Sequence, residues 1–110
     1  MIDAPGGVPA GAPLNPYVIQ HAVSSEWRVT PEGLQSKTRT KTLTMPRQVG
    51  MFLCRELLGL QLVEIGNAFG GRDHSTVIHS LERAQAMMAE DDGFRGRVDK
   101  VRGMLESMRR

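Results

Sequence analysis

The chain has 110 residues, of which 40% are hydrophobic and 24% charged, so it is long enough for one domain with a modest core. Its formal net charge of +2 does not by itself indicate a nucleic-acid partner. A single cysteine, Cys54, excludes a disulfide framework and a metal site of the cysteine type, and it favours the reducing cytosol. The sequence contains no run long enough to span a membrane and no signal-peptide pattern.

The start of the chain is rich in proline, glycine and alanine, which predicts a flexible linker over 1–14 and a folded domain over 15–110. Asn15 followed by Pro16 signals a helix start, because asparagine caps the first amides and proline fits the first turn. The first helix is expected from about Pro16 to Trp27, with Trp27 as a core anchor on its apolar face.

A short helical turn is expected next, starting at Thr30 and Pro31 and ending near Leu34. Residues 36–44 then alternate basic and hydroxyl-bearing side chains. Only Leu43 among them is apolar, so no face of this run would rest on a core. We therefore expect an exposed loop rather than a strand.

The third helix is expected to open at Thr44 or Met45 with Pro46, to run to about Leu58 and to end at Gly59. Further helices are expected over 62–69, from His74 to about Ala89, and from Phe94 to about Met108, the last with a regular apolar seam. Together they predict an all-α domain of five or six helices.

A tight turn joins the helices before and after residue 70. Gly70 and Gly71 can adopt the positive φ that ends one helix and redirects the chain. Asp73 can cap the next helix, and its charge suits the positive helix end. The polar row 74–76 then faces outward, because the apolar positions begin at Val77. This pattern predicts a helix-turn-helix, whose second helix enters the major groove of DNA.

Basic residues gather in one stretch just before this turn. Residues 36–55 contain no acid, whereas 56–110 are nearly balanced in charge. The block can supply a second contact with a polyanion. Its basic members are Lys37, Arg39, Lys41, Arg47 and Arg55.

The segment from Gly70 to His79 resembles the signature of the C-terminal domain of the bacterial chromosomal replication initiator family, DnaA. Ser36-Lys37-x-Arg39 resembles that family's basic loop, and Pro46-Arg47-Gln48 resembles its motif at the start of a long helix. The helix and turn over 64–71 are similar as well, so the likeness covers roughly residues 15–108. It implies a Trp-repressor-like helix-turn-helix domain of the DnaA C-terminal type.

The resemblance also implies a function and a set of contacts. The chain is expected to bind double-stranded DNA as one monomer per DnaA box, a site of the TTATCCACA type, at a replication origin. Arg39 would enter the minor groove, and Asp73, His74 and Ser75 would read bases in the major groove. Phosphate contacts are implied for Lys41, Arg47, Gln48, Arg55 and Thr76, and Lys37, Arg72 and Arg83 are further candidates from their charge and position.

The ATPase domain of the family is absent from this chain. We therefore expect no enzyme activity, no metal and no cofactor here, with ATP belonging only to the missing domain. Other replication-initiation proteins would act through the rest of the parent protein, at the nucleoid in the cytoplasm. The chain is compatible with an excised domain and with a stand-alone regulator that competes for the same boxes.

Several candidates also have a simpler structural interpretation. Asp73 can be an N-cap, a partner of cytosine N4, or both. Arg72 can bond the carbonyls of its own turn or a phosphate. Arg47 and Gln48, at a helix start, form either a phosphate clamp or part of a capped surface helix. His79 is expected to have a structural role against a neighbouring helix or the turn.

Arg83 can reach a phosphate or pair with Glu82 or Glu90 in solvent. Ser75 stands where the family commonly has threonine, and the missing methyl group can weaken contact with a thymine methyl. Thr38 and Met45 stand where relatives often carry basic residues, so the loop is less charged.

A different class of function is a protein-interaction module, in which the helix-turn-helix docks a partner and the seam of the last helix is partly exposed. The acid-free stretch 36–55 argues against it. An enzyme is the weakest interpretation, because Asp73 and His74 have no nucleophile, second carboxylate or metal set beside them.

Overall fold

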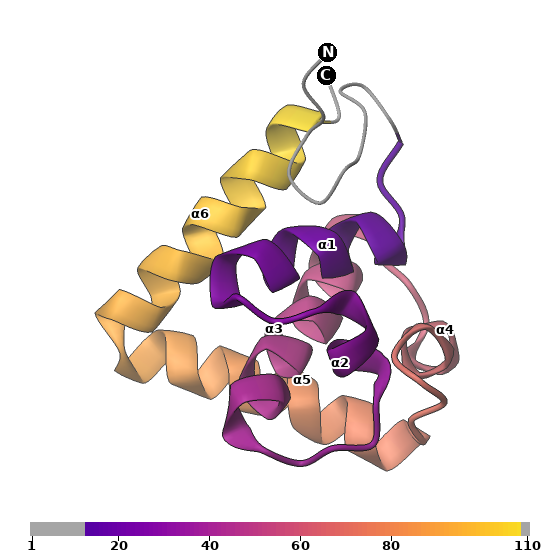
Figure 1. Cartoon of the computed structure of the whole chain (residues 1–110). Helices are drawn as coiled ribbons and strands as arrows, with labels where there is room; N and C mark the ends of the chain where they lie inside the picture. Colours follow the sequence, from indigo (N-terminus) through magenta and orange to yellow (C-terminus); the bar gives the residue numbers. More distant parts are fainter. Residues whose placement is uncertain (1–12, 109–110) are drawn as a thin grey trace.

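The computed structural model describes residues 13–108, which form six α-helices and, within that range, no strand. In chain order they are α1 (Pro16–Trp27), α2 (Pro31–Gln35), α3 (Lys41–Leu58), α4 (Leu62–Ala68), α5 (His74–Glu90) and α6 (Asp92–Met108). Helix α3 packs against α1, α2, α4 and α5, while α6 packs on α1 and α5 (Figure 1). The predicted all-α fold is confirmed, and residues 1–12 of the predicted linker lie outside the described residues.

Local sequence signals start the first two helices as predicted. Asn15 Oδ1 accepts hydrogen bonds from the N–H groups of Tyr17 and Val18, both at 2.9 Å. Thr30 Oγ1 accepts from the N–H of Gly33 at 3.0 Å. Each bond satisfies an amide that a helix start leaves without a partner.

The core is built from one face of each long helix around α3. Val49, Leu53 and Cys54 of α3 have no exposed surface. Burial raises the pKa of the Cys54 thiol to about 12, so the thiol stays protonated at neutral pH. The seam predicted for the last helix is buried along its whole length: Phe94, Val98, Val101, Leu105 and Met108.

Trp27, the predicted core anchor, packs against the core and fastens the end of α1 to α6. Its ring lies edge-on to Phe94, with centroids 6.1 Å apart, and the guanidinium carbon of Arg97 lies 4.3 Å from its centroid. Arg97 Nε also donates to Glu26 Oε2 at 3.1 Å, and Lys100 Nζ lies 3.2 Å from the same carboxylate. Aromatic and ionic contacts therefore join the two helices at this end.

The start of α3 differs from the prediction. The helix begins at Lys41 with Thr40 as N-cap, so Pro46 lies inside it and the predicted opening at Thr44 or Met45 is wrong. Pro46 removes one helical hydrogen bond. The side chain of Leu43 offsets this loss, because it packs so closely on Gly33 of α2 that a Cβ at Gly33 would lie 2.8 Å from Leu43 Cδ2. This tertiary contact holds the extra turn.

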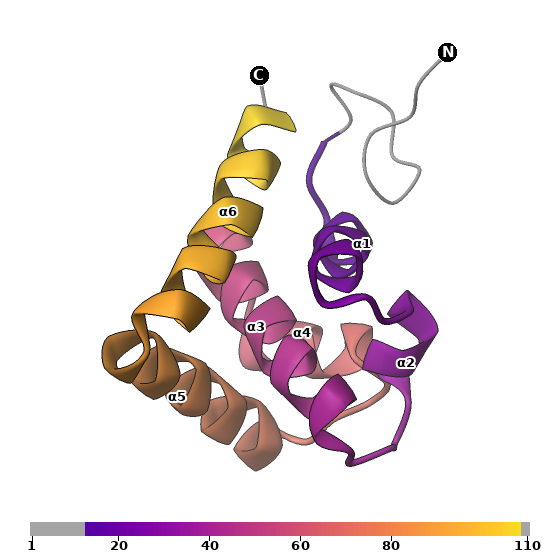
Figure 2. The same ribbon diagram turned by 60° about the vertical axis from the view of Figure 1, so that its left-hand side comes forward.

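Helices α5 and α6 meet at a sharp corner (Figure 2). A break was predicted here, but α6 starts at Asp92 rather than at Phe94. Asp91 forms the joint, because its Oδ1 accepts from the N–H of Phe94 at 3.0 Å and caps the new helix.

Candidate nucleic-acid interface

The turn before α5 depends on the two predicted glycines. Gly70 and Gly71 have φ values of 89° and 82°, in the left-handed region that favours glycine. The N–H groups of Gly71 and Arg72 both donate to the carbonyl of Gly66 at 2.9 Å, which folds the turn back onto α4. A Cβ at Gly66 would overlap the carbonyl oxygen of Arg72, so this approach requires glycine as well.

The first turn of α5 presents a row of exposed polar side chains. Asp73 Oδ1 accepts from the N–H of Thr76 at 2.8 Å, which confirms the N-cap interpretation of Asp73. That hydrogen bond lowers the pKa of the Asp73 carboxyl, so the cap is charged at neutral pH. His74, Ser75 and Thr76 are all exposed, as predicted, at the positive end of the helix.

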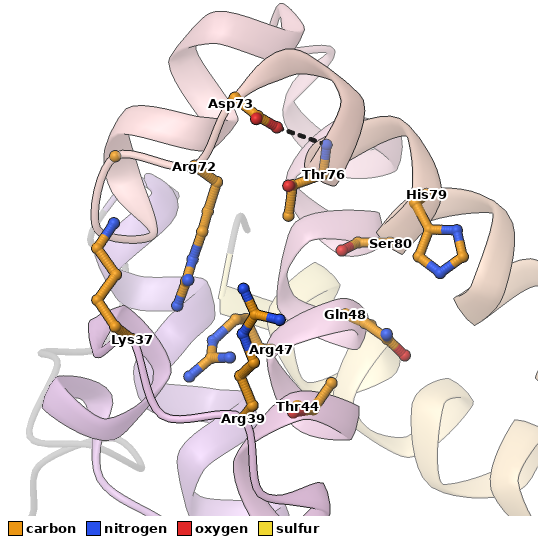
Figure 3. Close-up of a pocket in the computed structure, with 11 residues that line it drawn as sticks. Lys37, Arg39, Thr44, Arg47, Gln48, Arg72, Asp73, Thr76, His79 and Ser80 are labelled. Carbon is orange, nitrogen blue, oxygen red and sulfur yellow. Dashed lines mark hydrogen bonds between the residues drawn. The ribbon is translucent and has the colours of Figure 1, made fainter.

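A hollow of about 620 Å³ lies between this helix start and the basic segment, defined here as residues 36–40. We call it the basic hollow. Figure 3 shows cationic side chains entering it from one side and polar side chains of α5 from the other. Its lining residues are Lys37, Arg39, Thr44, Arg47, Gln48, Gly71, Arg72, Asp73, Thr76, His79 and Ser80.

Arg47 is buried rather than displayed at a helix start. It lies in the second turn of α3, is 6% exposed, and donates to three carbonyls: from Nε to Leu34 at 2.7 Å, from Nη1 to Thr38 at 3.0 Å and from Nη2 to Gly33 at 3.0 Å. Burial, and then the charge of Arg72, lower the pKa of Arg47 to about 10, which still leaves it protonated at neutral pH. The predicted clamp at a helix start is therefore wrong in its geometry, although the guanidinium still lines the basic hollow.

Arg72 and Lys37 also donate to backbone carbonyls. Arg72 Nε donates to Phe69 O at 2.9 Å and its Nη2 to Ser36 O, so of its two interpretations the turn-carbonyl one is observed. Burial, and then the charge of Arg39, lower the pKa of Arg72. Lys37 Nζ donates to Gly70 O at 2.8 Å. Of the cations that line the basic hollow, only Arg39 has no hydrogen bond or ion pair within residues 13–108.

The remaining predicted residues lie around this site. Gln48 lines the basic hollow, while His74 and Arg55 line a separate, smaller hollow of about 310 Å³. Arg55 Nη1 donates to the carbonyl of Leu60 at 2.5 Å. Lys41 is the first residue of α3 and is exposed. Arg83 is exposed farther along α5, and no ion pair to Glu82 or Glu90 forms within the described residues.

Sequence reasoning missed three residues of the hollow. His79, for which a structural role was predicted, is exposed and lines it together with Thr44 and Ser80. His79 lies three residues after Thr76, and that spacing places both on one face of α5. Val63 of α4 is 61% exposed and lines the smaller hollow together with His74. No pattern in the sequence predicted that this apolar side chain is exposed.

Two negative observations hold for the part of the chain that the structure describes. No group of three or more His, Cys, Asp or Glu side chains is placed to hold a metal ion. None of the helices between residues 13 and 108 is both long and apolar enough to cross a bilayer.

Comparison with known proteins assigns the chain. Over 88 residues it is 43% identical to the chromosomal replication initiator protein DnaA of Geobacter sp. (strain M21), and 42% identical to that of Citrifermentans bemidjiense; each match covers 80% of this chain and 19% of the relative. It is 41% identical over 92 residues to the DnaA of Thermomicrobium roseum, a match that covers 84% of this chain and 20% of that relative.

The chain thus spans about a fifth of the length of these relatives. The family described as bacterial dnaA protein helix-turn-helix matches residues 16–84, which include α1 to α4 and the exposed start of α5. The chain belongs to this family, the helix-turn-helix domain of bacterial DnaA proteins.

Proposed function

We propose that this domain binds double-stranded DNA and recognises DnaA boxes of the TTATCCACA type in replication initiation. One observation carries the proposal. Asp73 and Thr76 at the start of α5 line the same hollow as Lys37 and Arg39 of the basic segment, although the two stretches lie more than thirty residues apart in sequence. An α-helix fits the major groove, and a flanking cationic segment is then placed over the adjacent groove.

Arg39 is the candidate for the minor groove. It is exposed and has no protein partner among the described residues, so its guanidinium is free for DNA. A narrow A·T-rich minor groove concentrates negative potential, and arginine sheds its water more readily than lysine. The start of α5 supplies the candidates for base contacts in the major groove: Asp73, His74 and Ser75.

Asp73 combines two roles in this proposal. One carboxylate oxygen caps Thr76, and the other can accept from cytosine N4. Phosphate contacts fall to side chains around the reading elements, namely Lys41, Gln48, Arg55, Thr76 and Arg83, with Lys37, Arg47 and Arg72 contributing the donors that their carbonyl bonds leave unused. Phosphate contacts fix orientation on the duplex and make affinity fall with salt.

The wider setting follows from the DnaA relatives. One domain per box is the simplest stoichiometry for a single reading helix. ATP binding, contacts with other initiation proteins and action at the nucleoid would reside in a full-length parent. A stand-alone regulator would use the same face. The protein-interaction alternative loses its main argument, because the α6 seam that it required to be exposed is buried.

The test is fluorescence-anisotropy binding to a duplex carrying TTATCCACA and to a scrambled duplex, each at two salt concentrations. A preference for the box that persists at the higher salt is expected. Arg39→Ala should weaken binding by roughly 1–3 kcal/mol, with the loss concentrated at the A·T-rich end of the box. His74→Ala should relax base choice in the major-groove half.

Arg95→Ala is the matched control, because Arg95 is an exposed arginine on α6 whose ion pair with Asp92 is local. It should change binding to the box and to the scrambled duplex little and equally. Equal binding of both duplexes by the unaltered protein, lost at the higher salt, would refute recognition of the box.

A further inference from the structure

We infer that Arg72 and Lys37 are positioning residues, which lock the basic segment to the glycine turn so that Arg39 and the start of α5 meet DNA at a fixed spacing. This inference rests on the proposed function. It assigns both cations a task in addition to phosphate contact, the role predicted for Lys37 and one of the two predicted for Arg72.

The two cations form a reciprocal pair of ties. Lys37, in the basic segment, donates from Nζ to the carbonyl of Gly70 in the turn at 2.8 Å. Arg72, in the turn, donates from Nη2 to the carbonyl of Ser36 in the basic segment. Arg72 also donates from Nε to Phe69 O at 2.9 Å, which fixes its guanidinium to the end of α4. Figure 3 shows both side chains extending across the gap between the two segments.

On the core side of these two hydrogen bonds, backbone packing and a buried glutamine join the residues just before the basic segment to the end of α4 and the glycine turn. A Cβ at Gly70 would overlap the carbonyl oxygen of Gln35, so the two backbones are in direct contact. The fully buried Gln20 donates to Ala68 O at 2.8 Å and accepts from Gln35 Nε2 at 2.7 Å. The junction is therefore continuous from the core to the surface.

The ends of the basic segment are held, because Ser36 bonds Gly33 O and Thr40 O accepts from the first turn of α3, but its middle has few other contacts. Its residues from Lys37 to Thr40 are exposed, and Thr38 N–H reaches only the Ser36 hydroxyl, at 3.3 Å. Arg47 ties the segment to α3 through Thr38 O. Ordering a backbone residue costs conformational entropy, so a segment that is held in place before binding loses less entropy when it binds DNA. Arg39 sits between the tied positions 37 and 38 on one side and the N-cap of α3 on the other.

The alternative is that Arg72 and Lys37 act only through their charge, and it makes different predictions for DNA binding. If Arg72 and Lys37 only neutralised phosphates, removing either would weaken the box and the scrambled duplex equally and would lower the salt slope by about one. If they position Arg39, their loss weakens the box more than the scrambled duplex. The loss of box affinity caused by Arg39→Ala is then smaller in these variants than in the unaltered protein.

The experiment uses the whole chain and two variants, Arg72→Lys and Lys37→Gln. Arg72→Lys keeps the charge but replaces the planar guanidinium, whose Nε and Nη2 reach two carbonyls, by a single nitrogen, and Lys37→Gln alters only an exposed side chain. Thermal unfolding first establishes that both fold. Backbone ¹⁵N order parameters of residues 37–40 are then measured without DNA. They should match the helices in the unaltered protein and fall below about 0.6, the flexible range, in both variants.

Binding is measured next as a double-mutant cycle with Arg39→Ala. In the unaltered background Arg39→Ala should lower box affinity at least about fivefold, the lower end for a direct base contact. In either variant background its effect should fall below about twofold, while the salt slope of Arg72→Lys stays unchanged because the charge is retained. Arg95→Lys serves as the control and should change none of these readouts.

Unchanged order parameters in both variants, or an Arg39→Ala effect that stays fivefold in their backgrounds, would overturn the inference. Failure of the proposed function looks different, because the unaltered protein would then show no preference for the box. In that case the order parameters measured without DNA would still test whether Arg72 and Lys37 hold the basic segment in place.

Discussion

Replacing Arg47 by methionine should destabilise the fold rather than only weaken DNA binding. The side chain donates to three carbonyls, but these differ in what remains after its loss. Gly33 O also accepts from the N–H and the hydroxyl of Ser36, at 3.2 and 2.8 Å, and Thr38 is exposed to water. Leu34 has no exposed surface, so its carbonyl would be left buried without a donor.

An unsatisfied buried acceptor costs about 1–3 kcal/mol, and we add a smaller loss for the other two bonds. Methionine retains most of the buried alkyl volume and removes a buried charge, which limits the total. The unfolding free energy of Arg47→Met should therefore fall by roughly 2–3 kcal/mol. For a domain of this size that corresponds to a Tm decrease of about 8–24 °C.

Urea unfolding and thermal unfolding, both followed by circular dichroism, measure this effect. Arg47→Lys should lie between the two proteins, because one ammonium can satisfy Leu34 O but not all three carbonyls. Arg95→Met, at an exposed position on α6, should change stability by less than about 0.5 kcal/mol. The reasoning is refuted if Arg47→Met unfolds like the unaltered protein and lowers binding to every duplex equally, since Arg47 would then act only as a phosphate contact and not in the fold.

Three further predictions test the turn, the cap and the hollow. Gly66→Ala should lower the unfolding free energy by about 1–3 kcal/mol, because the added Cβ would overlap Arg72 O. This loss should outweigh the better helix propensity of alanine. A Tm at or above that of the unaltered protein would contradict the prediction. Asp73 has a lowered pKa, so its cap should stabilise the fold above its ordinary pKa and be lost as pH falls below about 4. Asp73→Asn should keep the cap without that acid dependence and Asp73→Ala should lose it, as unfolding curves between pH 7 and pH 2 would reveal. His79→Ala should leave the Tm unchanged and weaken duplex binding roughly threefold to tenfold in the anisotropy assay, which is about the free energy of one hydrogen bond. A lowered Tm with unchanged binding would instead support the structural role predicted from sequence.

Local signals explain why most helix boundaries were predictable from sequence. Asn15, Thr30 and Asp73 cap helices through bonds that span only two or three residues, so the sequence pattern contains all that is needed. The start of α3 was not predictable in this way. It depends on Leu43 packing against Gly33, a contact between residues that no local pattern joins.

For the candidate site, too, some features were predictable from sequence and others were not. The family resemblance and the acid-free basic stretch pointed to most of the side chains that line the basic hollow, whereas helical periodicity indicated only that the start of α5 faces outward. The bond from Arg72 to Phe69, three residues away, was one of its two predicted interpretations. The other carbonyls that Arg47, Arg72 and Lys37 bond were not predictable, because they lie between 9 and 36 positions away and only folding brings these groups together.

Cys54, buried in the C-terminal half of α3, has a practical consequence for studying this protein. Alkylating reagents attack the thiolate, and a thiol that is buried with a pKa of about 12 offers almost none of it. Because the chain has one cysteine, any labelling by a maleimide must follow an opening that exposes α3. The labelling rate under native conditions therefore reports how often the core opens, and DNA that binds only the folded state should slow it.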